Sequence, residues 1–590
     1  MNQFRFLLQK KQLQYWLLLI IFLVASWPLL KPGMFKIHDF THGARIAEMT
    51  QALQDGQFPV RWTQHFGFGY GMPLFEFYAP LPFYLGSIFY WLFGNLLGSV
   101  KFIFLLTNGL SLLGAYLLGK KLFKTDLAGI VTSLTFTLAP YRFLNLYIRG
   151  AASELWGIMA LPWIIWSTVK LIHKEKWSWL WSIVSWSVLF LSHNISTLIF
   201  TPFIFVLIGL YLMTVYFNKQ LNFKDILKFM TEISTSLLLA IGLSSFYLIP
   251  AFVEKDLTKV SDYILGYYFN YKLHFLYIRQ FFRPNWSFGG SEWGPDDPIS
   301  FFLGYGQLLV IVLMMIAIIF MIRKTVISKN RSNLIHLSWP LGLIGLFFVS
   351  LIMTTEKSQV LWHNISLLEF VQFPWRFLGM SIFILGLLAG WLVQYSQLVL
   401  LKLKKQSFYF LLVGTILVSL LFNLRFTQPE TFIEDTQAIY YANPAKISLE
   451  MSQILPDYLP LSLESNIQPP PSLIVKDLSF SEQDYEVLVN RSHEKLIKFH
   501  TTEPLKINVA LAYYPGWKAW NGLTPTELAV ASNGTMLVNL NEGDNLIALK
   551  FTNTPIRLLS DLISLLSLLI IGLLIFINQI NYQKLSVNQN

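Results

Sequence analysis

Long apolar runs separated by short polar connectors dominate the pattern of the chain. Twelve of these runs are long enough to cross a membrane as helices. They cover residues 15–30, 102–119, 127–140, 155–172, 178–192, 198–216, 233–252, 301–322, 335–353, 377–398, 408–424 and 558–578. No small-residue cleavage site follows the first run, so we expect it to be retained as a span. The pattern predicts a polytopic α-helical membrane protein with about 12 spans.

A further apolar run at 82–97 is ambiguous, and the basic connectors decide its interpretation. Short basic stretches lie at 120–124, 174–176, 219–228, 323–331 and 402–405. If 82–97 does not cross, all of them fall on the side of the basic N-terminus, as the positive-inside tendency favours. We therefore expect 82–97 to be re-entrant or interfacial. The protein would then lie in the plasma (cell) membrane with both termini cytoplasmic.

The pattern changes to strand-like alternation between residues 425 and 557. Alternating stretches lie at 472–475, 485–489, 505–511 and 536–540, with turn residues between them. We expect three parts. Residues 1–424 would form the transmembrane domain with an outer loop at 31–81, residues 425–557 an extracytoplasmic β-sandwich-like domain, and residues 558–590 the final span and a cytoplasmic tail.

Composition narrows the class of protein further. The 590 residues are 54% hydrophobic and 13% charged, too few charges to cover a soluble chain of this length. In a membrane protein, we expect the net charge of +11 to reflect basic connectors that set the membrane orientation rather than nucleic-acid binding. The chain has no cysteine, which excludes disulfides, thiolate metal sites and cysteine nucleophiles. No Walker, HExxH, GxSxG or dinucleotide-binding motif is present.

The outer loop at 31–81 carries the most unusual polar residues. Asp39 precedes a helical pattern at 40–54, with His38, His42 and Arg45 close by in sequence. Asp39 suits two roles equally well: an N-cap for that helix, or a general base at the membrane mouth. The apolar positions of 40–54 share one face, so we expect this helix to lie flat at the interface.

Glu76 stands among aromatic residues in a glycine-rich part of the same loop. It is a weaker candidate for substrate binding, because a structural hydrogen-bond partner is an equally good interpretation.

Ionisable residues also recur at the outer ends of the spans. The expected positions of Arg149, Glu154, His193 with Asn194, and Arg376 are on the same side as Asp39. Ionisable groups within reach of a span are costly and usually face a polar cavity, so we expect one shared outward cavity. Arginine and histidine in such a cavity suit a phosphate or pyrophosphate group. Arg142, in contrast, is expected to be an interface anchor.

Several short stretches together resemble the glycosyltransferase C (GT-C) superfamily, and more closely the YfhO-like and "6-pyruvoyl-tetrahydropterin synthase-related" bacterial membrane proteins. The stretches are 38–62, 67–82, 149–154, 192–194, 373–376 and 513–518. The pterin label does not imply that activity, because the soluble pterin synthase needs a cysteine and zinc-binding histidines. The resemblance implies an enzyme that moves a hexose or pentose from a polyprenyl-phosphate carrier to a glycan, teichoic acid, lipid or protein of the cell envelope.

The resemblance also implies roles for the candidate residues. Asp39 would deprotonate the acceptor hydroxyl or position a divalent cation that does so. Arg149, His193 and Arg376 would neutralise the departing phosphate, which needs no general acid. Because Phe40 rather than a second acid follows Asp39, the sequence does not favour a metal there. No organic cofactor is expected.

Two other classes stay open at this point. A flippase or transporter of lipid-linked sugars would also need a cationic cavity, although such a protein should show related halves. A non-catalytic membrane scaffold that displays the β domain is the other alternative.

Overall fold

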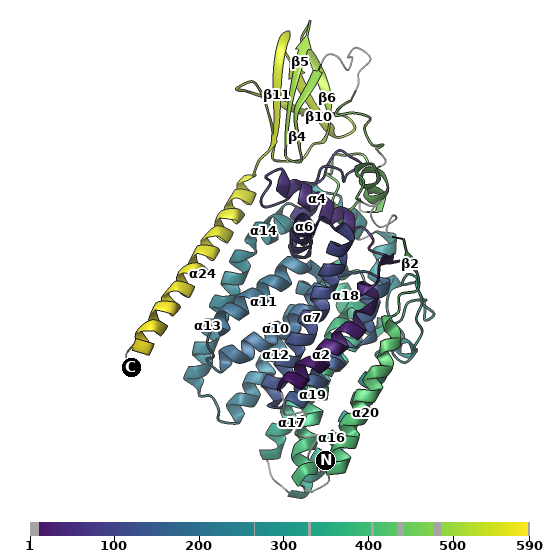
Figure 1. Cartoon of the computed structure of the whole chain (residues 1–590), viewed down its shortest axis with the longest axis vertical. Helices are drawn as coiled ribbons and strands as arrows, with labels where there is room; N and C mark the ends of the chain where they lie inside the picture. Colours follow the sequence, from purple (N-terminus) through teal and green to yellow (C-terminus); the bar gives the residue numbers. More distant parts are fainter. Residues whose placement is uncertain are drawn as a thin grey trace. The chain divides into compact units, whose positions relative to one another are not determined.

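A computed structural model gives the fold of the chain (Figure 1). The structure describes residues 11–264, 266–328, 332–402, 406–434, 442–454, 456–465, 467–475 and 485–587. The chain divides into two compact units. The first unit contains Met1–Phe40, Ile103–Ala240 and Tyr267–Ile433, and the second contains Thr41–Phe102, Ile241–Gly266 and Glu434–Asn590.

The first unit is a bundle of apolar helices. Its longer helices are α2 (Lys11–Ala25), most of α7 (Leu96–Phe123), α8 (Asp126–Thr137), α10 (Ala152–Ile172), α11 (Ser178–Ser192), α12 (Asn194–Phe217), most of α13 (Phe223–Leu243), α16 (Tyr305–Ser328), α17 (Ser332–Ile352), α19 (Leu378–Lys402) and α20 (Gln406–Leu421). Short helices α3 (Trp27–Leu30), α9 (Pro140–Phe143) and α18 (Gln359–Asn364) and a two-stranded sheet of β1 (Met34–Phe35) and β2 (Phe432–Ile433) complete it.

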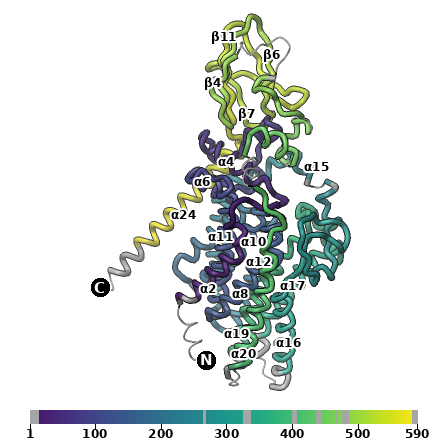
Figure 2. Tube along the Cα trace, turned by 45° about the vertical axis from the view of Figure 1, so that its right-hand side comes forward, coloured from purple at the N-terminus to yellow at the C-terminus, as the bar shows by residue number. Residues whose placement is uncertain are grey.

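Helix α19 lies at the centre of this bundle. Residues 378–393 of this helix are all buried. The helix packs along α8, while α10 packs along α11 (Figures 1 and 2). A Cβ added at Gly386 would lie 3.0 Å from the carbonyl oxygen of Thr132, so the glycine permits the close approach of α19 to α8. Small residues allow this kind of contact between membrane helices.

The prediction of a polytopic helical membrane protein is confirmed. Among the described residues, eight helices are long and apolar enough to cross a membrane, and the bent pair α8 and Pro140–Ile148 is a ninth candidate. Three shorter apolar helices, Gln14–Ala25, Ser178–Ser192 and Leu337–Ile352, coincide with the remaining predicted spans. The predicted run at 233–252 is interrupted, because α13 ends at Leu243 and α14 (Ser245–Val253) begins two residues later.

The second unit contains the ambiguous run and the helix of the outer loop. Most of the run at 82–97 forms α6 (Leu81–Phe93), and its last two residues begin α7. The 13 residues of α6 extend about 20 Å and so fall short of a bilayer core of about 30 Å. Helix α4 (His42–Gln54) was expected to lie flat at the interface, and that placement stays a prediction. Most of its residues are buried, Ile46 and Met49 completely, because it packs against α6 and other segments of the unit.

The second unit also contains two antiparallel sheets, so the predicted β domain is confirmed. One sheet has the strand order β3-β6-β10-β9 and the other β4-β5-β11-β7-β8. The strands are β3 (Ile474–Val475), β4 (Tyr485–Arg491), β5 (Glu494–Thr501), β6 (Leu505–Ala512), β7 (Trp517–Asn521), β8 (Thr524–Thr526), β9 (Leu528–Val530), β10 (Thr535–Leu540) and β11 (Gly543–Phe551). Alternate residues of β5, β10 and β11 are buried, which is the pattern of sheets that share a core.

The remaining helices of the second unit are α5 (Leu74–Phe77), α14, α15 (Val260–Ile264), α22 (Pro444–Lys446), α23 (Ser452–Ile454) and α24 (Pro555–Val587). The unit therefore joins segments from three parts of the sequence, whereas the sequence suggested contiguous domains with boundaries at 424 and 557.

Candidate active site

A bend in the chain before α10 brings several polar side chains together in the first unit. Helix α9 continues into a π-helical turn, the wide turn at Leu144–Ile148, and α10 begins at Ala152. Gly150 lies between them with φ of +65°, and a Cβ there would lie 2.5 Å from Cδ1 of Ile37. Glycine is needed at this position on both counts.

The carboxylate of Glu154, in the first turn of α10, is the centre of this group. Its Oε1 accepts hydrogen bonds from the Tyr141 hydroxyl (2.6 Å) and the Asn145 amide (3.2 Å). Its Oε2 accepts one from Nη1 of Arg149 (2.8 Å) and lies 3.3 Å from Nε of Arg376. We call these five residues the Glu154 cluster. Since both oxygens of the buried carboxylate are bonded, Glu154 is suited to hold the two arginines rather than to contact a substrate.

Each arginine of the cluster is fixed by further contacts. Arg376 lies in a 3-10 turn, Pro374–Phe377, ahead of α19, and its Nη1 donates to the carbonyl of Val371 (2.7 Å) and to Gln372 (3.1 Å). The guanidinium of Arg149 lies 4.4 Å from the centre of the Trp375 ring. In the described part of the chain, Nη2 of neither arginine donates a hydrogen bond to a protein group. Two cationic donors therefore remain for an anion.

Asp39 is linked to this cluster through the backbone. The amide of His38 donates to the carbonyl of Ile148 (3.0 Å), and the amide of Asp39 donates to the carbonyl of Arg149 (2.9 Å). The charge of Asp39 acts on His38, Arg149 and Arg376. Burial and the neighbouring Arg149 guanidinium lower the pKa of His38, so this imidazole is neutral at pH 7.

Asp39 does not occupy the N-cap position of α4. Helix α4 begins at His42 with Thr41 at its N-cap position, so Asp39 lies two residues before the cap. Asp39 is half-buried and lies in the first unit, whereas α4 belongs to the second.

His193 connects α11 and α12 beside the cluster. Its Nδ1 accepts from the backbone amide of Ser196 (3.1 Å) and lies 2.7 Å from the Ser196 hydroxyl, so the imidazole caps α12. His193 interacts electrostatically with Glu154, Arg376 and Arg149. Asn194, the first residue of α12, is exposed. Of the predicted residues, the structure thus brings together Asp39, His38, Arg149, Glu154, Arg376 and His193.

The other predicted residues lie in the second unit. His42 is buried against the Phe83 ring. The guanidinium of Arg45 lies over the Tyr78 ring (4.0 Å), donates to its hydroxyl and interacts with the carboxylate of Asp457. Asp457 was not found from the sequence, because its partner lies more than 400 residues away and no local motif marks it.

Glu76 is enclosed in a buried ion-pair network of the second unit. Its Oε2 lies 3.0 Å from Nε of Arg557, and its Oε1 accepts from the Tyr514 hydroxyl (3.1 Å). Nε of Arg557 donates its single hydrogen to Glu254 (2.9 Å). This network favours the structural interpretation of Glu76.

Arg142 is not an interface anchor, contrary to the expectation. It is buried and donates to the Ser111 hydroxyl (2.7 Å) and to Oδ1 of Asn108 (3.2 Å). Asn145 was missed by sequence reasoning, because it lies in the wide turn rather than at a predicted span end. Among the described residues, no three His, Asp or Glu side chains converge as a metal site would require.

Comparisons with known proteins agree with the membrane class. A family model described as "6-pyruvoyl-tetrahydropterin synthase related domain; membrane protein" matches residues 75–427. An uncharacterized protein of Lactococcus lactis subsp. cremoris (strain MG1363) is 24% identical over 341 residues, which are 56% of this chain and 52% of that protein. The chain therefore spans about half the length of this relative.

Some solved structures are similar at a lower level. The oligosaccharyltransferase of Archaeoglobus fulgidus in the apo form is 14% identical with a TM-score of 0.40, over 76% of this chain and 56% of that chain. ArnT from Cupriavidus metallidurans bound to undecaprenyl phosphate is 11% identical with a TM-score of 0.34, over 74% and 77%. Similarity at these scores carries no argument about the activity of the chain, which must be inferred from its own residues.

Proposed function

The chain belongs to the 6-pyruvoyl-tetrahydropterin synthase-related family of membrane proteins, and on that premise we propose that it is a GT-C-like glycosyltransferase. It moves a sugar from a polyprenyl-phosphate carrier to a cell-envelope acceptor on the outer face of the plasma membrane. One arrangement supports this most: two buried arginines share Glu154, while the backbone of Arg149 holds Asp39 beside them.

The arginines supply the binding of the donor phosphate. Arg149 and Arg376 each keep an Nη2 group that donates to no other group in the described part of the chain, and guanidinium groups match phosphate oxygens in geometry. Glu154 fixes the directions of both side chains. Donors fixed in advance around a developing phosphate charge cost no reorganisation during the reaction.

Asp39 supplies the base. As the acceptor oxygen bonds to C1 of the sugar, its proton passes to the Asp39 carboxylate. The bond from C1 to the phosphate oxygen breaks, and its electron pair leaves with the polyprenyl phosphate, whose charge the two arginines stabilise. This leaving group needs no proton, so a second carboxylic acid is not required.

The test is Asp39→Asn in proteoliposomes supplied with a panel of polyprenyl-phosphate hexoses and pentoses and with cell-wall glycan and lipid acceptors. Released polyprenyl phosphate is measured by mass spectrometry. The wild-type protein should release it with at least one donor, and Asp39→Asn should reduce the rate by about 100-fold or more.

Asp256→Asn is the matched control, because Asp256 is exposed in a 3-10 turn of the second unit. It should keep the wild-type rate. Wild-type release by the Asp39→Asn protein would exclude Asp39 as the base. No release by the wild-type protein with any donor would refute the proposed transfer.

A further inference from the structure

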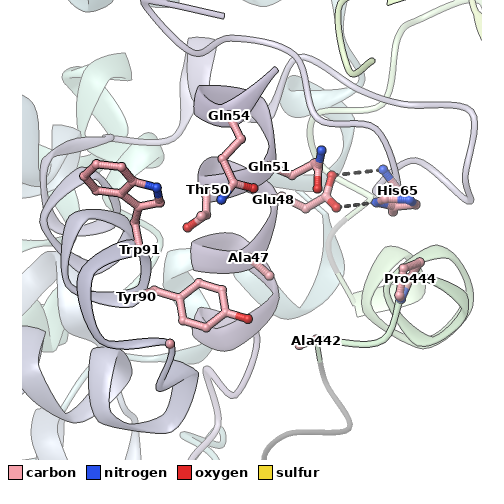
Figure 3. Close-up of a pocket in the computed structure, with 11 residues that line it drawn as sticks. Ala47, Glu48, Thr50, Gln51, Gln54, His65, Tyr90, Trp91, Ala442 and Pro444 are labelled. Atoms are coloured by element: carbon pink, nitrogen blue, oxygen red, sulfur yellow. Dashed lines mark hydrogen bonds and ion pairs between the residues drawn. The ribbon is translucent and has the colours of Figure 1, made fainter. Parts of the chain in front are cut away.

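A pocket of about 400 Å³ lies in the second unit, and none of the residues of the Glu154 cluster lines it. Helix α4 and the C-terminal end of α6 form two of its walls, and the loop that carries His65 forms a third (Figure 3). This volume is at the lower end of the range for small-molecule sites and is enough for one or two sugar rings.

A buried carboxylate on α4 and an imidazole on the neighbouring loop are joined by hydrogen bonds in the lining of the pocket. Oε1 of Glu48 lies 2.5 Å from Nδ1 of His65, and Oε2 accepts the backbone amides of Gln64 (2.8 Å) and His65 (3.0 Å). Glu48 is 3% exposed and His65 is 26% exposed. The carboxylate thus fixes the ring, and Nε2 is the ring atom left for a ligand.

The other lining groups are neutral and polar or aromatic. Gln54 comes from α4, and Tyr90 and Trp91 come from the end of α6 (Figure 3). Trp91 is 67% exposed. Gln54 is exposed and Tyr90 is half-buried, and both line the pocket. The pocket therefore presents donors and acceptors next to aromatic rings.

The chemistry of the lining excludes several classes of ligand. A phosphate would need cations, but among the described residues that line the pocket only His65 can be cationic, and Glu48 already neutralises it. A purely apolar ligand would leave the amide and hydroxyl groups without partners. A sugar ring has hydroxyls along its edge and C–H groups on its faces, so it matches both the polar and the aromatic groups.

We propose that this pocket is a carbohydrate-binding site, in which Gln54, Tyr90 and His65 hydrogen-bond ring hydroxyls and Trp91 packs against a ring face. The site belongs to the second unit alone, and its binding of a glycan does not depend on catalysis by Asp39.

The test measures binding to the purified full-length protein in a detergent without a sugar headgroup. The probes are the methyl glycosides of glucose, galactose, mannose and N-acetylglucosamine, with cellobiose, lactose and chitobiose, followed by saturation-transfer NMR. At least one probe should bind. Trp91→Ala and Gln54→Leu should each weaken it at least fivefold.

Leu92→Ala is the matched control, because Leu92 is the next residue on α6, is 61% exposed and does not line the pocket. It should bind as the wild type does, and so should Asp39→Asn, which separates this proposal from the transferase activity. Binding by none of the probes would overturn the proposal, and so would wild-type binding by the Trp91→Ala protein. Displacement of the probe by inorganic phosphate would identify an anion site instead and would also overturn it.

Discussion

Nη1 of Arg149 lies 2.8 Å from Oε2 of Glu154, across a bend that contains Gly150. The bond closes the bend between α9 and α10, because one residue precedes it and the other follows it. The same oxygen lies 3.3 Å from Nε of Arg376, so one buried carboxylate orders side chains from two distant segments.

Glu154→Ala should therefore be among the most destabilising substitutions in the first unit. It leaves two buried guanidinium groups without their anion, a loss of about 3–5 kcal/mol in the free energy of unfolding. The melting temperature in detergent should fall accordingly. Glu154→Gln keeps the shape and should fold better, but should reduce transfer. Glu356→Gln, at an exposed residue, should melt like the wild type. An unchanged melting temperature for Glu154→Ala would contradict the structural role of this carboxylate.

Substitution of Arg376 distinguishes a phosphate ligand from a membrane anchor. The Arg376 guanidinium contacts Val371, Gln372 and Glu154 and still has a donor for phosphate. A lysine ammonium has too few donors, in the wrong geometry, to make all of these contacts at once. Arg376→Lys should raise the donor concentration at half-maximal rate about tenfold, and Arg376→Ala should raise it further. Rates measured against donor concentration check this. Equal donor dependence in the wild type and the lysine variant would leave Arg376 without a role in donor binding.

The network of Glu76, Glu254 and Arg557 predicts a specific pH dependence. Burial and a hydrogen bond with Glu254 raise the pKa of Glu76 well above its usual value. Nε of Arg557 donates to Glu254 (2.9 Å) and Nη2 of Arg557 donates to Oε1 of Glu76 (3.2 Å), while a proton on Glu76 supplies its hydrogen bond with Glu254. The pKa of Glu254 is lowered, because its contacts with Glu76 and Arg557 outweigh the effect of burial.

When the pKa of a carboxyl group is higher in the folded state than in the unfolded state, only the folded protein binds the proton at pH values between the two pKa values. The free energy of unfolding should therefore fall as the pH rises from about 4.3 toward the folded pKa of Glu76. Glu76→Gln should reduce this fall and keep stability near pH 7 within about 1 kcal/mol of the wild type. Glu254→Gln should lower the melting temperature near pH 7 by several degrees. Equal losses in both variants would show that Glu76 is ionised in the folded protein.

The absence of cysteine permits a direct test of the proposed topology. Single cysteines at Lys121 and Lys219 should be shielded from an impermeant thiol reagent in intact cells, and a cysteine at Lys357 should react. Lys219 and Lys357 are exposed in the folded protein, so burial does not protect them. Ready labelling at Lys121 and Lys219 would mean that 82–97 crosses the bilayer.

The sequence predicted the helices and strands better than it predicted which of them contact one another. Apolar runs become helices because an unsatisfied backbone in lipid is costly. Alternation predicted β6 and β10, which bury residues in the core, and it also predicted β4, an edge strand with no buried residue. β5 and β11 were missed, although they pair along eight residues. The burial of helix α4 was not predicted, because its buried polar residues, such as Glu48 and Arg45, find partners from other segments, which a helical pattern does not reveal.

The candidate site was predicted only in part for the same reason. Charged residues at the ends of apolar runs stand out, and so Arg149, Glu154 and Arg376 were found. Their common use of one carboxylate depends on the packing of α10 against the start of α19, residues more than 200 positions apart. The Glu48–His65 pair was missed because neither residue belongs to a recognised motif.

The two backbone bonds from His38 and Asp39 to Ile148 and Arg149 have a mechanical consequence. They connect the loop that carries Asp39, the proposed base, to the bend that carries Arg149, the proposed phosphate ligand. A fluctuation of the loop then carries both groups in the same direction, and the distance between them varies less than the position of either. The proposed base and the proposed phosphate ligand would therefore keep a constant separation during the reaction.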